Sequence, residues 1–179
     1  MGPYGATKRA AEGLLANSGL DVTVIRPHLV YGKGDKGLFS RLLAVIQNFP
    51  VVPILGHGRH RIQPVYIDDV VECIVRCFES QETFGRTYNL VGDEPISMNE
   101  FVDLIAEVMK VKRIKVHLPF FVARISARLL PLLMKQPPVT YDNVIGMNQY
   151  QLWDSEAAKK DLGFTPRPLR QGLKLALSS

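Results

Sequence analysis

The chain contains 179 residues, of which 46% are hydrophobic and 22% are charged, and its 22 basic and 17 acidic side chains give a formal net charge of +5. A hydrophobic fraction this high with so small a net charge excludes an intrinsically disordered chain. The length is sufficient to bury a core in one domain or in two small ones. The basic excess is divided evenly between the two halves, so we expect no nucleic-acid partner.

The cysteines and the apolar segments bear on the cellular compartment. Cys73 and Cys77 lie four residues apart in an apolar run that predicts a helix, which favours buried free thiols over a disulfide scaffold or a metal site. The first five residues lack the basic and apolar parts of a signal peptide. The longest apolar segment, 118–134, contains two arginines and two prolines and is short for a membrane span of about 20 residues. We therefore expect a cytoplasmic protein that binds no metal and does not associate with a membrane.

Helix and strand patterns alternate along the first part of the chain. Apolar residues at helical spacing predict helices, and β-branched runs bounded by glycine or proline predict strands. These patterns indicate, in order, a helix at 7–17, a strand at 22–25, a glycine-rich turn at 32–37, a helix at 38–47 and extended segments at 51–55 and 62–67. This alternation is typical of an α/β fold.

Polar residues mark the starts of the next two helices. Asp68 and Asp69 precede the cysteine helix, and N-capping is favoured over catalysis for them, because a carboxylate there accepts backbone N–H bonds. A strand is predicted at 87–91. Ser97 and Glu100 then form a capping box before a helix that extends to Met109.

The segment 108–141 contains seven basic and no acidic residues. One interpretation is an amphipathic surface for anionic lipid or a partner protein. The favoured one is a pair of core-packing helices whose basic face lies in water. Beyond this segment, Asp154 and Ser155 predict a helix cap, Gly163 predicts the end of that helix, and a last helix is predicted after Pro168.

Tyr4 and Lys8 are the first residues that suggest chemistry. They lie four residues apart at the start of a predicted helix, so both side chains can lie on one face. An ammonium group close to a phenol favours the phenolate, and such a tyrosine can exchange protons with a substrate hydroxyl. The spacing alone is a weak signal in a chain with six tyrosines, so the surrounding motifs decide its meaning.

Five motifs stand in a recognisable order along the chain. They are Tyr4-x-x-x-Lys8, the Arg26-Pro27-His28-Leu29-Val30-Tyr31-Gly32 run, Gln63-Pro64-Val65-Tyr66-Ile67-Asp68-Asp69-Val70, Tyr88-Asn89-Leu90-Val91-Gly92 and Leu162-Gly163-Phe164-Thr165-Pro166. Together they resemble the extended short-chain dehydrogenase/reductase family of NAD-dependent epimerases and dehydratases. The Gln-Pro-Val variant is most similar to the atypical branch that includes nucleotide-sugar epimerase-like proteins and an accessory subunit of respiratory complex I.

The resemblance implies a fold and its division into parts. It implies an α/β fold consisting of the C-terminal part of a Rossmann-type NAD(P)-binding fold, formed by residues 1–31 and 62–92, and a small α/β substrate-binding lobe, formed by residues 32–61 and 93–179. The N-terminal, glycine-rich dinucleotide-binding half of the family fold is absent from the sequence. We therefore expect a fragment that is inactive alone.

The resemblance also implies roles for individual residues. Tyr4 would be the catalytic acid/base, and Lys8 would lower its pKa and bind the nicotinamide ribose, so that both contact NAD or NADP. Pro27 and His28 would lie beside the nicotinamide. The cofactor would carry the redox step, in which a substrate carbon gives up hydride as its hydroxyl loses a proton to the tyrosine.

A basic loop is the candidate substrate contact. Arg59 and Arg61, with His57 and His60, would face a nucleotide-sugar or a related hydroxyl or keto compound, since a guanidinium fork suits diphosphate oxygens. The family's epimerases carry an arginine where this chain has Ile62. A solvated basic loop is the alternative interpretation.

Two functions follow from these observations. The first is an NAD(P)-dependent epimerase/dehydratase-like oxidoreductase acting on a small molecule. The second is a non-catalytic binding or assembly protein with the same fold, in which residues 108–141 form the contact surface. A further hypothesis is a homodimer that covers an open sheet edge and apolar helix faces.

Overall fold

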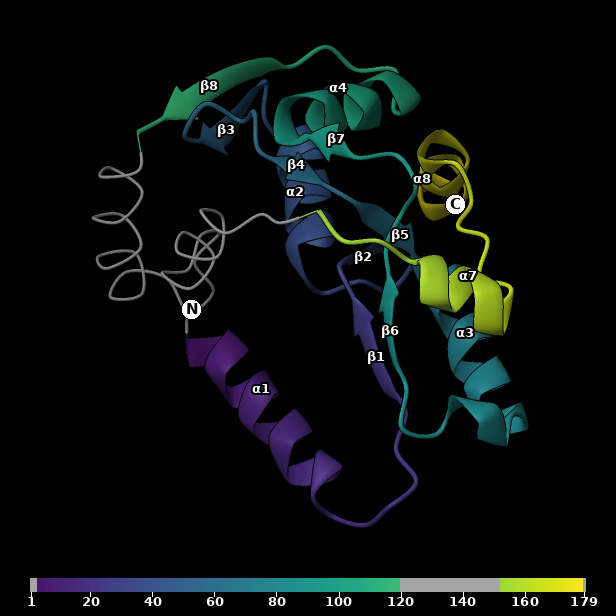
Figure 1. Ribbon diagram of the computed structural model, residues 1–179. Helices are drawn as coiled ribbons and strands as arrows, with labels where there is room; N and C mark the ends of the chain where they lie inside the picture. The colour runs from purple at the N-terminus through teal and green to yellow at the C-terminus, as the bar shows by residue number, and fades with distance from the viewer. Residues whose placement is uncertain (1–2, 120–151, 179) are drawn as a thin grey trace. The chain divides into compact units, whose positions relative to one another are not determined.

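The computed structural model describes residues 3–119 and 152–178, which are drawn as a coloured ribbon in Figure 1. These residues form two compact units. Unit 1 contains residues 3–6, 36–62 and 96–119, and unit 2 contains residues 7–35, 63–95 and 152–178. The predicted division into a Rossmann-type part and a lobe stays a prediction.

Unit 2 is built from two pairs of parallel strands and the helices that cover them. Its elements are α1 (Pro3–Ala16, whose first residues belong to unit 1), β1 (Val24–Pro27), β2 (Leu29–Tyr31), β5 (Pro64–Tyr66), α3 (Ile67–Glu79), the 3-10 turn η1 (Gln81–Thr83), β6 (Thr87–Leu90), α7 (Glu156–Leu162) and α8 (Leu169–Leu177). Strand β1 pairs with β6, with Val24 opposite Thr87 and Pro27 opposite Leu90. Strand β2 pairs with β5, with Tyr31 opposite Tyr66. The alternation of helices and parallel strands confirms the predicted α/β class.

Apolar side chains from both strand pairs and two helices form the core of unit 2. In Figure 1, α7 lies beside α3 and β6, and these elements are in contact. The core residues are Val65, Val70, Cys73, Cys77, Tyr88, Leu90, Ala158, Leu162 and Phe164. Both cysteines are buried free thiols, as the sequence predicts.

Unit 1 contains one parallel and one antiparallel strand pair. Its elements are α2 (Leu38–Asn48), β3 (Val51–Leu55), β4 (Arg61–Ile62), β7 (Ile96–Ser97), α4 (Met98–Val108) and β8 (Ile114–Leu118). Strand β3 runs parallel to β8, and β4 runs antiparallel to β7. The buried rings of Phe39 and Phe101 pack α2 against α4, with centroids 6.4 Å apart.

The described part of the basic segment corrects one prediction. Residues 114–118 form a strand, where a helix pair was favoured. The segment is held extended by its parallel pairing with β3, from Val51 opposite Ile114 to Leu55 opposite Leu118. Arg113 holds the start of this strand by donating through Nε to the carbonyl of Ile46 at 2.6 Å. Residues 120–141 of the segment lie outside the described residues.

A second correction concerns the start of α3. The helix begins at Ile67, so Asp68 and Asp69 lie inside its first turn, and its N-cap residue Tyr66 makes no side-chain capping hydrogen bond. Acidic residues in a first turn are still favourable, because they face the positive end of the helix dipole. The predicted strand at 62–67 is likewise divided, since Ile62 pairs in β4 and Pro64 in β5.

Two local helix signals are confirmed. The Ser97 hydroxyl accepts from Glu100 N at 3.2 Å, and the Glu100 carboxylate accepts from Ser97 N at 2.8 Å, which is a complete capping box. Helix α7 ends at Gly163, whose φ of +60° is the left-handed conformation that glycine adopts most easily.

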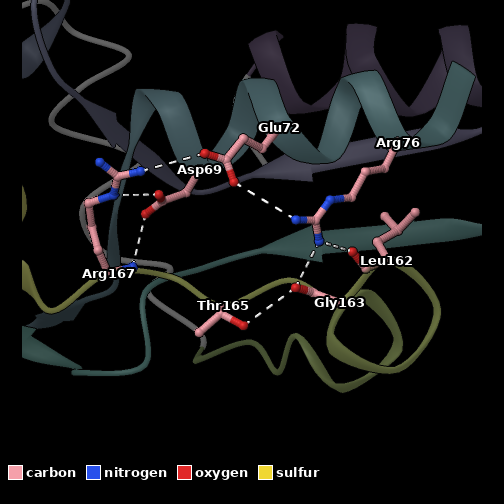
Figure 2. A network of polar contacts seen from close by, with 7 residues as sticks. All are labelled: Asp69, Glu72, Arg76, Leu162, Gly163, Thr165 and Arg167. Atoms are coloured by element: carbon pink, nitrogen blue, oxygen red, sulfur yellow. Dashed lines mark hydrogen bonds and ion pairs between the residues drawn. The ribbon is translucent and has the colours of Figure 1, made fainter. Parts of the chain in front are cut away.

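An ion-pair network attaches the C-terminal segment to α3 (Figure 2). The Asp69 carboxylate is 5% exposed, and it accepts from Arg167 N at 3.0 Å and from Arg167 Nε at 2.6 Å. About two turns further along α3, Arg76 donates to the carbonyls of Leu162 and Gly163. Glu72 lies between the two arginines and within ion-pair distance of both. This network fixes the end of α7 and the start of α8 on unit 2.

Candidate functional site

The carboxyl ends of β1 and β6 form the edge at which unit 2 offers a site. The two strands are parallel and end in register, at Pro27 and Leu90. His28 follows β1 directly, and its backbone N–H donates to the carbonyl of Leu90 at 3.2 Å. In open α/β sheets, ligands bind outside the carboxyl ends of the strands. We call this the strand-end site, and it contains Pro27 and His28, two of the predicted cofactor contacts.

The imidazole of His28 is half-buried and oriented by the backbone. Its Nδ1 accepts the backbone N–H of Gln63 at 3.3 Å. Burial lowers the pKa of His28 from its ordinary value of 6.5, so the ring is neutral at pH 7. A neutral imidazole that accepts at Nδ1 carries its proton on Nε2. The ring is therefore a neutral hydrogen-bond donor at its Nε2 end.

Gln63 connects three segments at the strand-end site. Its side-chain amide donates to the carbonyl of Trp153 at 2.9 Å and to that of Gly92 at 3.4 Å, and it accepts from Trp153 N at 2.9 Å. Nearby, the side chain of Asn89 donates to the carbonyl of Asp154 at 3.4 Å. Residues that are distant in the sequence, before α7 and after β6, are thus held beside His28.

Tyr4 and Lys8 both lie in α1, which begins at Pro3, before the predicted start at residue 7. Lys8 is exposed, and the side chain of Tyr4 lies outside the described residues. Glu12, further along the same helix, forms an ion pair with Arg26 of β1, and this hydrogen bond lowers the pKa of Glu12. Helix α1 is therefore attached to the strand that leads to His28, and the roles of Tyr4 and Lys8 stay predictions.

Arg59 and Arg61 lie in unit 1, and both are exposed. Asn99 shapes the loop before them, because its backbone N–H donates to the carbonyl of Gly58 at 3.1 Å and its side chain donates to that of His57 at 2.9 Å. The Asn99 amide oxygen also lies 3.0 Å from His117 Nε2 of β8. The structure thus holds the basic loop in a defined shape, and its contact with substrate stays a prediction.

Each unit contains an apolar cavity. In unit 2, a cavity of about 420 Å³ runs between β1 and α3 and is lined by Ile25, Pro27, Ile74, Phe78 and Phe84 among others. Phe78 is 88% exposed at its rim. In unit 1, a cavity of about 100 Å³ lies between α2, β3 and α4, with His60 at one end.

The strand-end site includes residues for which the sequence reasoning assigned no role. Gln63 belongs to one of the five family motifs, but the sequence predicts no role for its side chain. It predicts none for Trp153 or Asn89 either. The signal available for Gln63 was a lone amide within a run of apolar residues. Its partner 90 positions further along could not be identified from the sequence.

Two features are absent from residues 3–119 and 152–178. These residues contain no cluster of three or more His, Cys, Asp or Glu side chains that could hold a metal ion. Among the helices of the same residues, none combines the length and hydropathy needed to cross a membrane.

Comparison with known proteins identifies the family. Residues 1–91, about half of the chain, match the NAD dependent epimerase/dehydratase family. The chain belongs to this family. The predicted family is therefore confirmed, and so is NAD as the cofactor class of the family.

Three similar proteins show the range of the family. The chain is 29% identical over 174 residues to the mitochondrial NADH dehydrogenase (ubiquinone) 1 alpha subcomplex subunit 9 of Dictyostelium discoideum, covering 95% of this chain and 48% of that protein. It is 28% identical over 197 residues to 3beta-hydroxysteroid-dehydrogenase/decarboxylase isoform 1 of Arabidopsis thaliana, covering 98% and 45%. UDP-glucuronic acid 4-epimerase from Bacillus cereus, solved with UDP-glucuronic acid and NAD, superposes with a TM-score of 0.72 at 22% identity, covering 97% and 51%.

These matches confirm the Rossmann-type fold and show how much of each relative the chain covers. The high TM-score at low identity shows a shared fold. The chain covers about half the length of these two curated relatives.

Proposed function

We propose that the chain provides the catalytic and substrate-binding residues of an NAD(P)-dependent oxidoreductase of the epimerase/dehydratase type. The substrate class is a nucleotide-sugar or a related hydroxyl or keto compound. The observation that carries the proposal is the position of His28, a neutral imidazole held at the carboxyl ends of β1 and β6.

Tyr4 and Lys8 would carry the proton transfer. They lie four residues apart in α1, so their Cα atoms are separated by about 6 Å along the helix axis and lie on one face. The Lys8 ammonium favours the phenolate of Tyr4, which can then accept the proton of a substrate hydroxyl. The bound cofactor would accept hydride from the carbon that carries this hydroxyl.

Pro27 and His28 would hold the nicotinamide end of the cofactor. The described residues fit this role, because Pro27 offers no N–H and an apolar surface, while His28 offers a neutral donor at Nε2. A neutral donor such as His28 Nε2 suits the carboxamide oxygen of the nicotinamide. It also adds no charge beside the nicotinamide ring, whose own charge changes during hydride transfer.

Arg59 and Arg61 would bind the anionic part of a nucleotide-sugar. A guanidinium binds two diphosphate oxygens at once, and both side chains are exposed, Arg59 just after the loop that Asn99 shapes and Arg61 at the start of β4. The nucleotide-sugar epimerase among the solved neighbours supports this substrate class. The hydroxysteroid dehydrogenase among the relatives supports the wider class of hydroxyl and keto substrates.

The Tyr4→Phe variant tests the catalytic assignment. The assay needs a chain that also carries a glycine-rich dinucleotide-binding segment, because the 179 residues contain no such turn. We expect a loss of turnover of at least a hundredfold with NAD affinity nearly unchanged. The matched control Tyr88→Phe should keep its turnover, since the Tyr88 ring is buried in the core of unit 2 and its hydroxyl bonds Asp161 of α7. Equal activity of Tyr4→Phe and wild type would refute the assignment.

For the 179-residue chain alone, we expect negligible NAD affinity and no turnover. The reason is that no glycine-rich turn at a helix N-terminus is present in the sequence to bind the pyrophosphate. Isothermal titration calorimetry measures this directly, and a micromolar dissociation constant for NAD would contradict it.

A non-catalytic assembly protein is the second candidate. The similarity to a complex I subunit favours it. Its contact surface for a partner protein would include the described basic residues Lys110, Lys112 and Lys115. A homodimer would instead form through the exposed apolar surface around Phe78. Pull-down with a charge-reversed Lys110→Glu/Lys112→Glu chain tests the first surface. Light scattering of Phe78→Ser tests the second, where a wild-type chain that is monomeric at high concentration would exclude the homodimer.

A further inference from the structure

Gln63 is a polar side chain in an apolar setting. It lies between β4 and β5, is 5% exposed, and has the buried residues Ile62 and Val65 close by in the sequence. An amide buried without hydrogen-bond partners destabilises the folded chain. Here the amide oxygen has one partner and the amide nitrogen has two.

Two of these bonds connect Gln63 with a single residue. Its Nε2 donates to the carbonyl of Trp153, and its Oε1 accepts the N–H of the same residue, both at 2.9 Å. The side-chain amide of Gln63 thus makes with the Trp153 backbone the two-bond exchange that two backbone residues make in an antiparallel sheet. A single bond would let the segment rotate about it, whereas this pair fixes both the place and the orientation of Trp153.

The backbone of Gln63 acts on the neighbouring imidazole. Its N–H donates to Nδ1 of His28 at 3.3 Å, while its carbonyl accepts from Gly92 N at 3.5 Å. The same residue thus contacts the end of β1, the loop after β6 and the segment before α7.

We propose that Gln63 is a positioning residue of the strand-end site: its side chain holds residues 152–155 beside the carboxyl ends of β1 and β6, and its backbone holds His28 as the Nε2-protonated tautomer. The link to catalysis rests on the proposed function, because that function places the nicotinamide beside His28. We call the hydrogen bonds of Gln63 with Trp153 and with His28 the clamp. The clamp is a property of the 179-residue chain and can be measured without cofactor.

The wild-type chain tests the clamp first. Long-range ¹H–¹⁵N NMR correlation of the His28 ring at pH 7 should give an unprotonated Nδ1 and a protonated Nε2. Hydrogen exchange of the Trp153 amide should be at least a hundredfold slower than in an unstructured peptide. A protonated Nδ1, or a Trp153 amide that exchanges as in a peptide, would overturn the proposal.

Gln63→Glu and Gln63→Leu separate the clamp from general stability. Trp153 is the one tryptophan of the sequence and is 40% exposed, so acrylamide quenching of its fluorescence reports on this segment. In Gln63→Leu the quenching constant should at least double at every pH. In Gln63→Glu the quenching constant should match the wild type at low pH, where the protonated carboxyl donates to the Trp153 carbonyl. As the pH rises and the carboxyl loses its proton, the quenching constant should increase. The midpoint should lie above about 4.3, since burial against carbonyl oxygens raises the pKa of a carboxyl. The exposed Gln171 provides the control Gln171→Leu, which should leave quenching unchanged.

A folded Gln63→Leu chain with wild-type quenching would refute the clamp. In a chain that also carries a glycine-rich segment, Gln63→Glu should lose about tenfold in kcat as pH rises through the midpoint seen in quenching. A titration of Trp153 quenching with no matching change in kcat would refute the link to catalysis. If the wild type neither binds nor uses NAD, the proposed function fails, while the NMR and quenching results still decide the clamp.

Discussion

Arg167 and Asp69, 98 residues apart in the sequence, form a salt bridge in which Arg167 Nε lies 2.6 Å from Asp69 Oδ1. The Arg167 guanidinium also lies over the ring of Tyr66, with its carbon 4.7 Å from the ring centroid. The guanidinium therefore makes an ion pair with the buried carboxylate and a cation–π contact with the aromatic ring. This pair connects the first turn of α3 to the start of α8.

Replacing Arg167 with Met should destabilise unit 2 strongly. The substitution leaves the Asp69 carboxylate, which is 5% exposed, without its guanidinium partner. Breaking a buried pair in this way costs about 3 kcal/mol. Urea unfolding followed by circular dichroism measures the change. Lys160→Met, at an exposed position of α7, is the matched control and should change stability by less than about 0.5 kcal/mol. Equal stability of the two variants would contradict the importance of the pair.

The stability of the chain should fall as the pH drops below about 6.5. Burial lowers the pKa of His28 and that of His60 from their ordinary value of 6.5. The unfolded chain therefore binds more protons than the folded chain in acid, so the stabilisation is complete above the unfolded pKa and is lost as the pH falls through the folded value.

His28→Asn should flatten this decline, because the asparagine oxygen can accept the Gln63 N–H and does not titrate. Urea unfolding of wild type, His28→Asn and His60→Asn from pH 8 to pH 5 measures how much each histidine contributes to the decline in the free energy of unfolding. A His28→Asn chain that loses stability as steeply as wild type would show that His28 does not contribute to the decline.

Both cysteines should be unreactive in the folded chain. Burial raises the pKa of Cys73 to about 11 and also raises that of Cys77. At pH 8 the thiolate fraction of Cys73 is on the order of one thousandth, and the thiolate is the reactive form. Reaction with a disulfide reagent should be at least a hundredfold slower in buffer than in denaturing urea. Rapid modification of the folded chain would contradict the buried position of these thiols.

Gly172→Ala should destabilise α8, whereas Gly13→Ala should stabilise α1. A Cβ at Gly172 would lie 2.0 Å from the Tyr31 hydroxyl, so the overpacking costs about 2 kcal/mol. A Cβ at Gly13 meets nothing within 4 Å, and alanine is the better helix former by about 0.5–1 kcal/mol.

Tyr31→Phe combined with Gly172→Ala provides the internal check. Removing the hydroxyl relieves the closest contact, so the double variant should recover part of the loss in a double-mutant cycle. Additive effects of the two substitutions would show that the hydroxyl is not the obstacle.

Local signals in the sequence determined much of the secondary structure. The capping box of Ser97 and Glu100, the helix end at Gly163 and the presence of a helix around the two cysteines are as predicted, because each depends on hydrogen bonds or side-chain spacing within a few residues. The order of five short motifs along the chain also sufficed to recognise the family.

Contacts between distant segments required the tertiary structure. The partner of Asp69 is Arg167, the partner of Gln63 is Trp153, and the strand at 114–118 pairs with β3. In the sequence, the aspartate suited a helix cap, the glutamine had no assigned role, and the basic segment suited a helix. Burial decided the first two cases, since a carboxylate and an amide removed from water each require a hydrogen-bond partner. The strand is held by backbone hydrogen bonds to β3. In all three cases only the folded chain determines which distant segment supplies the partner.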